Sequence, residues 1–124
     1  MEMTNLEIAK KIANILDSKK AENVEVLGVM ELTSLAEYFV IASGNSSTQV
    51  KAMSDEVEVQ MTAAGIEPHH VEGERGGSWV LLDYDGVVVH IFYKEAREFY
   101  NLDKLWSDAE KVEYLMNNSP KESE

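Results

Sequence analysis

The stretch Tyr38-Phe39-Val40-Ile41-Ala42, followed by Gly44-Asn45-Ser46-Ser47, decides the fold of this 124-residue chain. Its first five residues are continuously apolar, a pattern typical of a central strand that is covered on both faces of a sheet. The glycine and the serines then end the strand, and Ser46 and Gln49 have the spacing of a capping box. The sequence therefore predicts a buried strand that leads directly into a helix.

Apolar periodicity extends this prediction to the rest of the chain. Residues 4–18 and 47–64 have helical spacing, and so does a segment after Lys94 that we extend into residues 107–116. Strands are predicted over residues 24–29, 38–42, 68–72, 78–84 and 87–93. Asp85-Gly86 separates the last two strands and is a strong hairpin signal.

This order of elements predicts an α/β fold, a mixed sheet of about five strands flanked by helices. We expect one domain over residues 1–116 and a polar C-terminal tail over 117–124 that is disordered. No internal repeat or linker divides the chain.

Composition narrows the class of function. The chain has no cysteine, which excludes disulfides, thiolate metal sites and cysteine nucleophiles. Eleven basic residues against 23 acidic ones give a net charge of −12, which disfavours direct binding to nucleic acid. The acidity fits both simple solubility and a basic protein partner. Without a signal peptide or an apolar run long enough to span a membrane, we expect a cytoplasmic protein.

One enzyme hypothesis rests on the Gly44–Ser47 turn, which could present backbone amides to a phosphate. The alternative function is therefore a metal-dependent, nucleotidyltransferase-like enzyme that uses this turn. Such enzymes need closely spaced aspartates to hold magnesium, and no Asp-x-Asp or Asp-x-Glu pair follows the turn in a matching position. We expect no catalytic residue and no cofactor.

A metal-binding module would have to use His69, His70 and His90, the three histidines of the chain. Adjacent histidines on a strand point to opposite faces, so His69 and His70 do not easily chelate one ion. His90 is predicted to lie inside the sheet with its hydrogen bonds satisfied. We therefore expect no metal site.

The remaining candidate is an interaction surface. Trp79, Leu81 and Asp83 share one face of their predicted strand, and strand alternation turns Val80, Leu82 and Tyr84 to the other. A second group contains Tyr100, Leu102, Leu105 and Trp106. Trp and Tyr are enriched at binding hot spots. From the residues alone Trp79 fits core and interface equally well, whereas we assign Phe99 and Leu105 to the core.

Several segments together resemble the RsfS/Iojap family of ribosomal silencing factors. They are residues 37–47, 49–52, 72–73, 79–84, 87–92 and 97–106, which include Glu-Tyr-Phe-Val-Ile-Ala-Ser-Gly-Asn-Ser-Ser, Trp-Val-Leu-Leu-Asp-Tyr and Arg-Glu-Phe-Tyr-Asn-Leu-Asp-Lys-Leu-Trp. Taken in order, these segments extend the resemblance over roughly residues 6–109. The chain departs from the family at Asp85-Gly86, where relatives usually have Gly-Asp, and at Thr48, where an arginine is common.

The resemblance implies a nucleotidyltransferase-like α/β fold without catalytic residues. It implies binding to large-subunit ribosomal protein fourteen at the intersubunit face, a steric block to subunit joining that represses translation, and a homodimer when free. The expected partner-binding residues are Trp79, Leu81, Asp83, Tyr84, Tyr100, Leu102 and Trp106, with Glu72 and Asp103. Glu74 is a further acidic candidate. The negative charge then complements a basic ribosomal protein.

Overall fold

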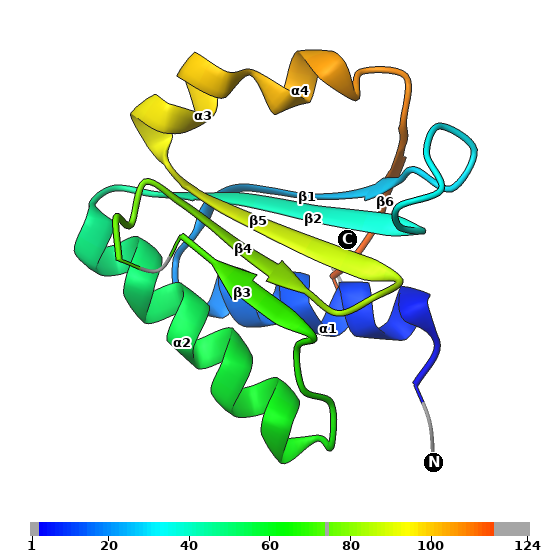
Figure 1. Ribbon diagram of the computed structural model, residues 1–124, viewed down its shortest axis with the longest axis horizontal. Coiled ribbons are helices and arrows are strands. Elements are labelled where there is room, and N and C mark those ends of the chain that lie inside the picture. Colours follow the sequence, from blue (N-terminus) through cyan, green and yellow to red (C-terminus); the bar gives the residue numbers. More distant parts are fainter. Residues whose placement is uncertain (1–2, 74, 116–124) are drawn as a thin grey trace, which may run out of the picture.

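The strand β2 (Tyr38–Gly44) lies at the centre of the molecule, as its apolar sequence predicts. The computed structural model describes residues 3–73 and 75–115. Six of the seven residues of β2 are buried, because helices cover it on both faces (Figure 1). Glu74 and the tail over 117–124 lie outside the described residues.

The sheet has six strands in the order β3-β4-β5-β2-β1-β6. Their bounds are β1 (Glu22–Gly28), β3 (His70–Glu72), β4 (Trp79–Asp83), β5 (Val87–Tyr93) and β6 (Glu110–Val112), together with β2. Among the described strands only β2 and β5 pair in parallel, and the other neighbours are antiparallel. The expected mixed sheet flanked by helices is confirmed.

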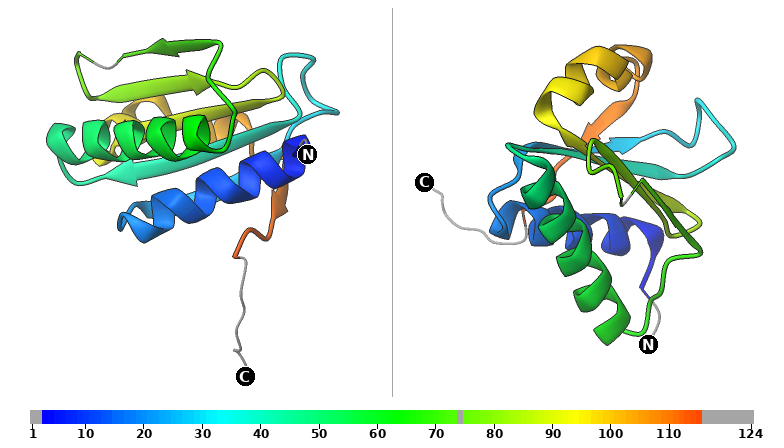
Figure 2. Two further views of the ribbon diagram at one scale, coloured as in Figure 1. Left: turned by 90° about the horizontal axis from the view of Figure 1, so that it is seen from below. Right: turned by 60° about the vertical axis from the view of Figure 1, so that its left-hand side comes forward.

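The described part of the chain has four helices, which form two layers around this sheet. Helices α1 (Asn5–Ser18) and α2 (Ser47–Ala63) cover one face, and the short helices α3 (Lys94–Tyr100) and α4 (Leu102–Leu105) lie over the other (Figures 1 and 2). The larger buried cluster lies under α1 and α2, and a smaller one lies under α3 and α4. Among the described residues no helix is long and apolar enough to cross a membrane.

The two long helices begin at the predicted caps. Thr4 forms a complete capping box with Glu7. The Ser46 hydroxyl accepts a hydrogen bond from the Gln49 backbone N–H at 3.1 Å. The Gln49 side chain, however, accepts from the backbone N–H of Asn45 rather than from that of Ser46. The Gly44–Ser47 segment therefore serves as a strand end and a helix cap.

The hairpin between β4 and β5 also forms at the predicted place. The Tyr84 N–H donates to the Val87 carbonyl at 2.8 Å, and Asp85 takes a positive φ of 74°. The Gly86 carbonyl accepts from the N–H groups of Glu37 and Tyr38, which ties the hairpin to the start of β2.

The C-terminal prediction was wrong in two respects. Asn101 adopts the left-handed conformation with φ 56°, which asparagine tolerates, and so divides the expected single helix into α3 and α4. The further helical turn predicted over 107–116 does not form within the described residues 107–115, because residues 110–112 form β6 instead. Val112 pairs with Val26 of β1 and packs against the core, so burial at the sheet edge outweighs local helical preference.

Gly44 provides a test of how tightly β2 packs against α2. A Cβ at this position would lie 2.9 Å from Met53 Cε and 3.0 Å from Val50 Cγ2. We expect Gly44→Ala to lower the free energy of unfolding by about 1–3 kcal/mol through overpacking. Gly76→Ala is the matched control, since nothing lies within 4 Å of its Cβ. Urea denaturation of both variants measures the difference, and equal stabilities would contradict the packing argument.

Candidate partner-binding surface

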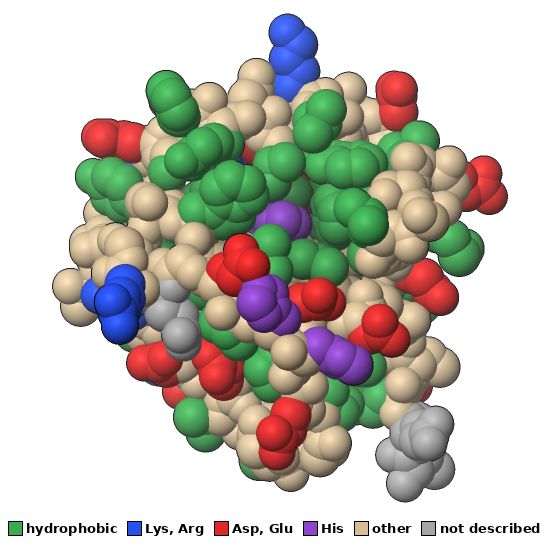
Figure 3. All heavy atoms as spheres, viewed as in Figure 1, with side chains coloured by type: hydrophobic (Ala, Val, Ile, Leu, Met, Phe, Trp, Pro, Cys, Tyr) green, Lys and Arg blue, Asp and Glu red, His purple; other side chains and the backbone are tan. Residues whose placement is uncertain are grey.

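The face of the sheet under α3 and α4 carries most of the predicted interface residues. Val80 and Leu82 of β4 are fully buried on the α1–α2 side, so Trp79, Leu81 and Asp83 point to the opposite face. The register adds neighbours to this face, since Trp79 pairs with Phe92, Leu81 with His90, and Glu72 with Leu81. Figure 3 shows hydrophobic side chains gathered over this side of the molecule, with acidic and histidine side chains below them.

Aromatic rings join the sheet to α3 and α4 in what we call the aromatic cluster. Its members are Phe39, Trp79, His90, Phe92, Tyr100 and Trp106. The Trp79 ring stacks on Phe92 at a centroid distance of 5.0 Å and meets Tyr100 at 4.7 Å. Trp79 is half-buried, so its ring is both held by the cluster and open to solvent.

His90 fixes the orientation of Trp79. The Trp79 indole N–H donates to Nδ1 of His90 at 3.2 Å, which places the proton of the neutral imidazole on Nε2. Burial lowers the pKa of His90 to about 4, so the ring is neutral at physiological pH and can accept this bond. Nε2 has no hydrogen-bond partner among the described residues, so the expectation of a fully satisfied histidine was wrong in that respect. Its predicted place inside the sheet is confirmed.

The outer side of α3 and α4 is more apolar and more exposed than the sequence suggested. Phe99 is 81% exposed and Leu105 is 70% exposed, which corrects their assignment to the core. Tyr100 is 50% exposed and Leu102 and Trp106 are partly buried. The prediction failed because α3 is short and turns Ala96 and Arg97 inward. We call the surface made of Trp79, Phe99, Tyr100, Leu102, Leu105 and Trp106 the apical surface.

Arg97 holds the apical surface to the sheet. Its guanidinium is buried and donates two hydrogen bonds to the Asp103 carboxylate, at 3.0 and 2.9 Å. The same group donates to the Asn23 carbonyl at 2.8 Å and to the Ser43 hydroxyl at 2.9 Å. These bonds join α3 and α4 to β1 and β2.

Two of the expected binding residues, Asp103 and Tyr84, are not free on the apical surface. The Arg97 hydrogen bonds lower the pKa of Asp103, and this carboxylate is committed within the chain rather than free for a partner. Tyr84 is only 5% exposed and packs on the α1–α2 side, where burial and then the charge of Glu58 raise its pKa to about 12. Strand alternation separates Tyr84 from Trp79, so we leave it out of the proposed surface.

The acidic border of the surface comes from β3 and β4. Glu72 is exposed, and its carboxylate is hydrogen-bonded to Nε2 of His70. Asp83 is partly exposed, and its carboxylate accepts from the Asp85 N–H at 2.8 Å. Neither carboxylate is paired with a Lys or Arg of the described residues, and the ion-pair partner of Glu72 is His70, which is charged only when protonated. Both carboxylates can therefore face a basic partner.

The donors around the Gly44–Ser47 turn do not fit a magnesium site. A cavity of about 340 Å³ beside the turn is lined by Asn45, Ser46, Ser47, Gly76, Gly77, Ser78 and Tyr93. These residues supply hydroxyl and amide groups but no carboxylate, the ligand that Mg²⁺ sites commonly use. Over residues 3–73 and 75–115, no group of three His, Cys, Asp or Glu side chains is arranged to hold a metal.

Comparison with known proteins identifies the class to which this fold and surface belong. The model of the family described as RsfS, ribosomal silencing factor during starvation, matches residues 2–124. The chain therefore belongs to this family of ribosomal silencing factors, and the resemblance found in the sequence is confirmed.

The similarity to relatives extends over nearly the whole chain. This chain is 42% identical over 111 residues to the ribosomal silencing factor RsfS of Halalkalibacterium halodurans, and the match covers 90% of this chain and 95% of the relative. The chloroplastic Iojap protein of Zea mays is 32% identical over 114 residues, which covers 87% of this chain and 47% of that protein. A crystal structure of a Chromobacterium violaceum protein superposes with a TM-score of 0.82 at 32% identity, covering 98% of this chain and all of that one.

The buried His90 predicts a pH dependence of stability. Its pKa is about 4 in the folded protein against 6.5 for an ordinary histidine. Between these two values the unfolded chain binds a proton at His90 and the folded chain does not. The free energy of unfolding therefore falls as the pH drops from 6.5 toward 4. We expect His90 to contribute about 2 kcal/mol of this loss between pH 7 and 4.5. Urea denaturation at both pH values should show a smaller loss in His90→Gln than in the unmodified chain. Equal losses would mean that His90 is not the group responsible.

From the hydrogen bonds of Arg97 we predict that its loss destabilises α3 and α4 locally. Removing it in Arg97→Met leaves Ser43 buried without its donor and Asp103 without its cation. We expect a loss of about 2–3 kcal/mol, less than for a fully buried pair because Asp103 is partly exposed. Hydrogen exchange should accelerate in residues 94–106 more than in α1 and α2. Lys94→Met removes a charge from the same helix at an exposed position and serves as the control.

Proposed function

We propose that this protein binds the large ribosomal subunit through ribosomal protein fourteen and sterically prevents the small subunit from joining. It acts in the cytoplasm, without catalysis, by occupying space at the intersubunit face. The observation that carries the proposal is the half-buried Trp79, held by His90 and Phe92 beside the exposed apolar residues of α3 and α4.

Preorganisation supports this use of the apical surface. A side chain that is already fixed loses little conformational entropy when a partner covers it. Trp79 has its indole N–H bonded to His90 and its ring stacked on Phe92, so its orientation is set before binding. A half-buried tryptophan surrounded by apolar contacts has the properties of a binding hot spot. Phe99, Tyr100 and Leu105 are exposed beside it and extend the apolar contact area.

Charge favours a protein rather than RNA as the point of contact. The net charge of −12 opposes close approach to phosphate, whereas Glu72 and Asp83 beside the apical surface complement a basic protein. Association with the partner should therefore be fast at low salt and should slow as added salt screens these charges. The same apolar surface is available for self-association, and we propose that the free protein is a homodimer through it.

The proposal is tested by sedimentation of the purified protein with separated ribosomal subunits on sucrose gradients. The protein should travel with large subunits, and adding small subunits should then yield fewer joined ribosomes than in its absence. If the protein stays at the top of the gradient, the proposed function fails for this chain.

Variants of the apical surface locate the contact. We expect Trp79→Ala and Phe99→Ala each to weaken large-subunit binding by about tenfold or more, the effect of removing a hot-spot side chain. Phe99 is exposed and its loss should leave the fold intact, so it separates binding from folding. Val59→Ala is the matched control, because Val59 is an exposed apolar residue of α2, 64% accessible to solvent, on the opposite face. Unchanged binding by both apical variants would show that the contact lies elsewhere.

A further inference from the structure

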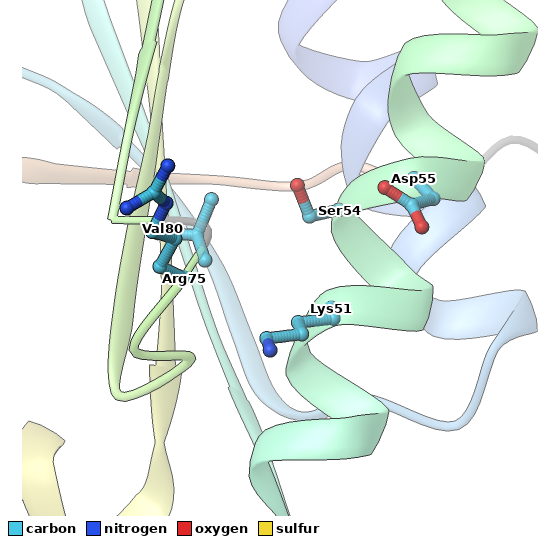
Figure 4. A pocket seen from close by; sticks show the side chains of 5 residues that line it. All are labelled: Lys51, Ser54, Asp55, Arg75 and Val80. Atoms are coloured by element: carbon cyan, nitrogen blue, oxygen red, sulfur yellow. The ribbon is translucent and has the colours of Figure 1, made fainter.

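A cavity between α2 and β4 lies on the opposite side of the sheet from the apical surface. It has a volume of about 350 Å³ and is lined by Lys51, Ser54, Asp55, Arg75 and Val80 (Figure 4). Val80 is fully buried and faces the α1–α2 core, which fixes the side of the sheet on which the cavity opens. The cavity is separate from the aromatic cluster and takes no part in the proposed contact with the ribosome.

Ser54 is the first sign that the cavity takes a polar ligand. The residue is only 1% exposed, and its hydroxyl has no hydrogen-bond partner among the described residues. Figure 4 shows this hydroxyl on the side of α2 that faces β4 and the cavity, across from Val80. A buried hydroxyl without a partner is unfavourable, so a group that enters the cavity and accepts its hydrogen bond gains free energy.

Two cations face the same space from different elements. Lys51 lies one turn before Ser54 on α2, and Arg75 lines the opposite wall of the cavity from the loop between β3 and β4 (Figure 4). The loop packs closely on α2, since a Cβ on Gly77 would lie 2.9 Å from Cβ of Ser47. Over residues 3–73 and 75–115 neither cation forms an ion pair. The chain has a net charge of −12, so two cations without ion-pair partners beside a buried hydroxyl stand out from the rest of the surface. Such a site favours the binding of a small anion.

We propose that this cavity binds inorganic phosphate or the phosphate group of a small monoester. Arg75 binds phosphate oxygens through its planar guanidinium and Lys51 through its ammonium group, while Ser54 donates its hydroxyl proton to a third oxygen. Asp55, the single carboxylate of the lining, accepts from the P–OH of hydrogen phosphate or from a ligand hydroxyl.

The occupant is a free small molecule rather than a nucleic-acid backbone. The cavity volume is at the lower end of the range for small-molecule sites. A polyanion would also meet the repulsion of the whole chain over its length, whereas a single phosphate meets mainly the two nearby cations. A monoester carries a terminal dianion that can contact both cations, and a backbone diester carries a single charge.

The test is an NMR titration of the full-length ¹⁵N-labelled protein with inorganic phosphate, with ionic strength held constant by sodium chloride. We expect saturable shifts in the amides of residues 51–55 and 76–77. Lys51→Ala and Ser54→Ala should each weaken the fitted affinity by about tenfold, the effect of losing one charge-assisted or buried hydrogen bond. Lys19→Ala removes the same charge from an exposed position on α1's C-terminal cap and should leave the affinity unchanged.

Two further probes distinguish the source of the phosphate. Glycerol 3-phosphate, a monoester, should produce the same shifts, and dimethyl phosphate, a diester, should not. Equal binding of the diester would overturn the assignment to a free monoester. Shifts that do not saturate, that spread over lysines elsewhere, or that survive in both cavity variants would overturn the site itself. Because Lys51 is exposed, Lys51→Ala keeps the test valid if Ser54→Ala proves unstable.

Discussion

The hydrogen-bond network of Arg97 is the interaction on which the arrangement of the apical surface depends. Helices α3 and α4 have seven and four residues, too short to be stable without tertiary contacts. The buried guanidinium gives them such contacts by linking Asp103 across the left-handed Asn101 to Asn23 and Ser43 of the sheet. A buried cation is tolerated here because its donors meet a carboxylate, a carbonyl and a hydroxyl. Without this network only the ring contacts of Tyr100 and Trp106 and the packing of the smaller core cluster would hold α3 and α4 to the sheet.

The two faces of the sheet differ in how much of their packing is buried. The face under α1 and α2 carries the larger of the two buried clusters. The opposite face buries a smaller cluster, and its aromatic rings continue outward into α3 and α4. Packing there serves two purposes, since Phe92 and His90 both fill the core and orient Trp79. This double use explains why Trp79 fits core and interface equally well when only the sequence is considered.

Local patterns in the sequence predict those parts of the fold that local physics controls. The capping box at Thr4, the apolar strand over 38–42 and the Asp85-Gly86 turn all depend on residues close together in the chain. Other features depend on the assembled sheet and were missed. Strand β6 has three residues and exists because the edge of β1 accepts it. The bond between Trp79 and His90 requires the register of β4 and β5, and Arg97 and Asp103 are six residues apart, which is not a helical spacing.

Both edges of the sheet end in strands of only three residues, β3 and β6. Short edges offer few unpaired backbone groups, and those of this chain carry Glu72, Glu110 and Lys111, whose charges discourage strand addition. The sheet therefore resists growth by edge-to-edge pairing with a second copy, a common route to aggregation. The homodimer that we propose would then form through side-chain contacts on a face, and such a dimer could dissociate when another protein competes for the same residues.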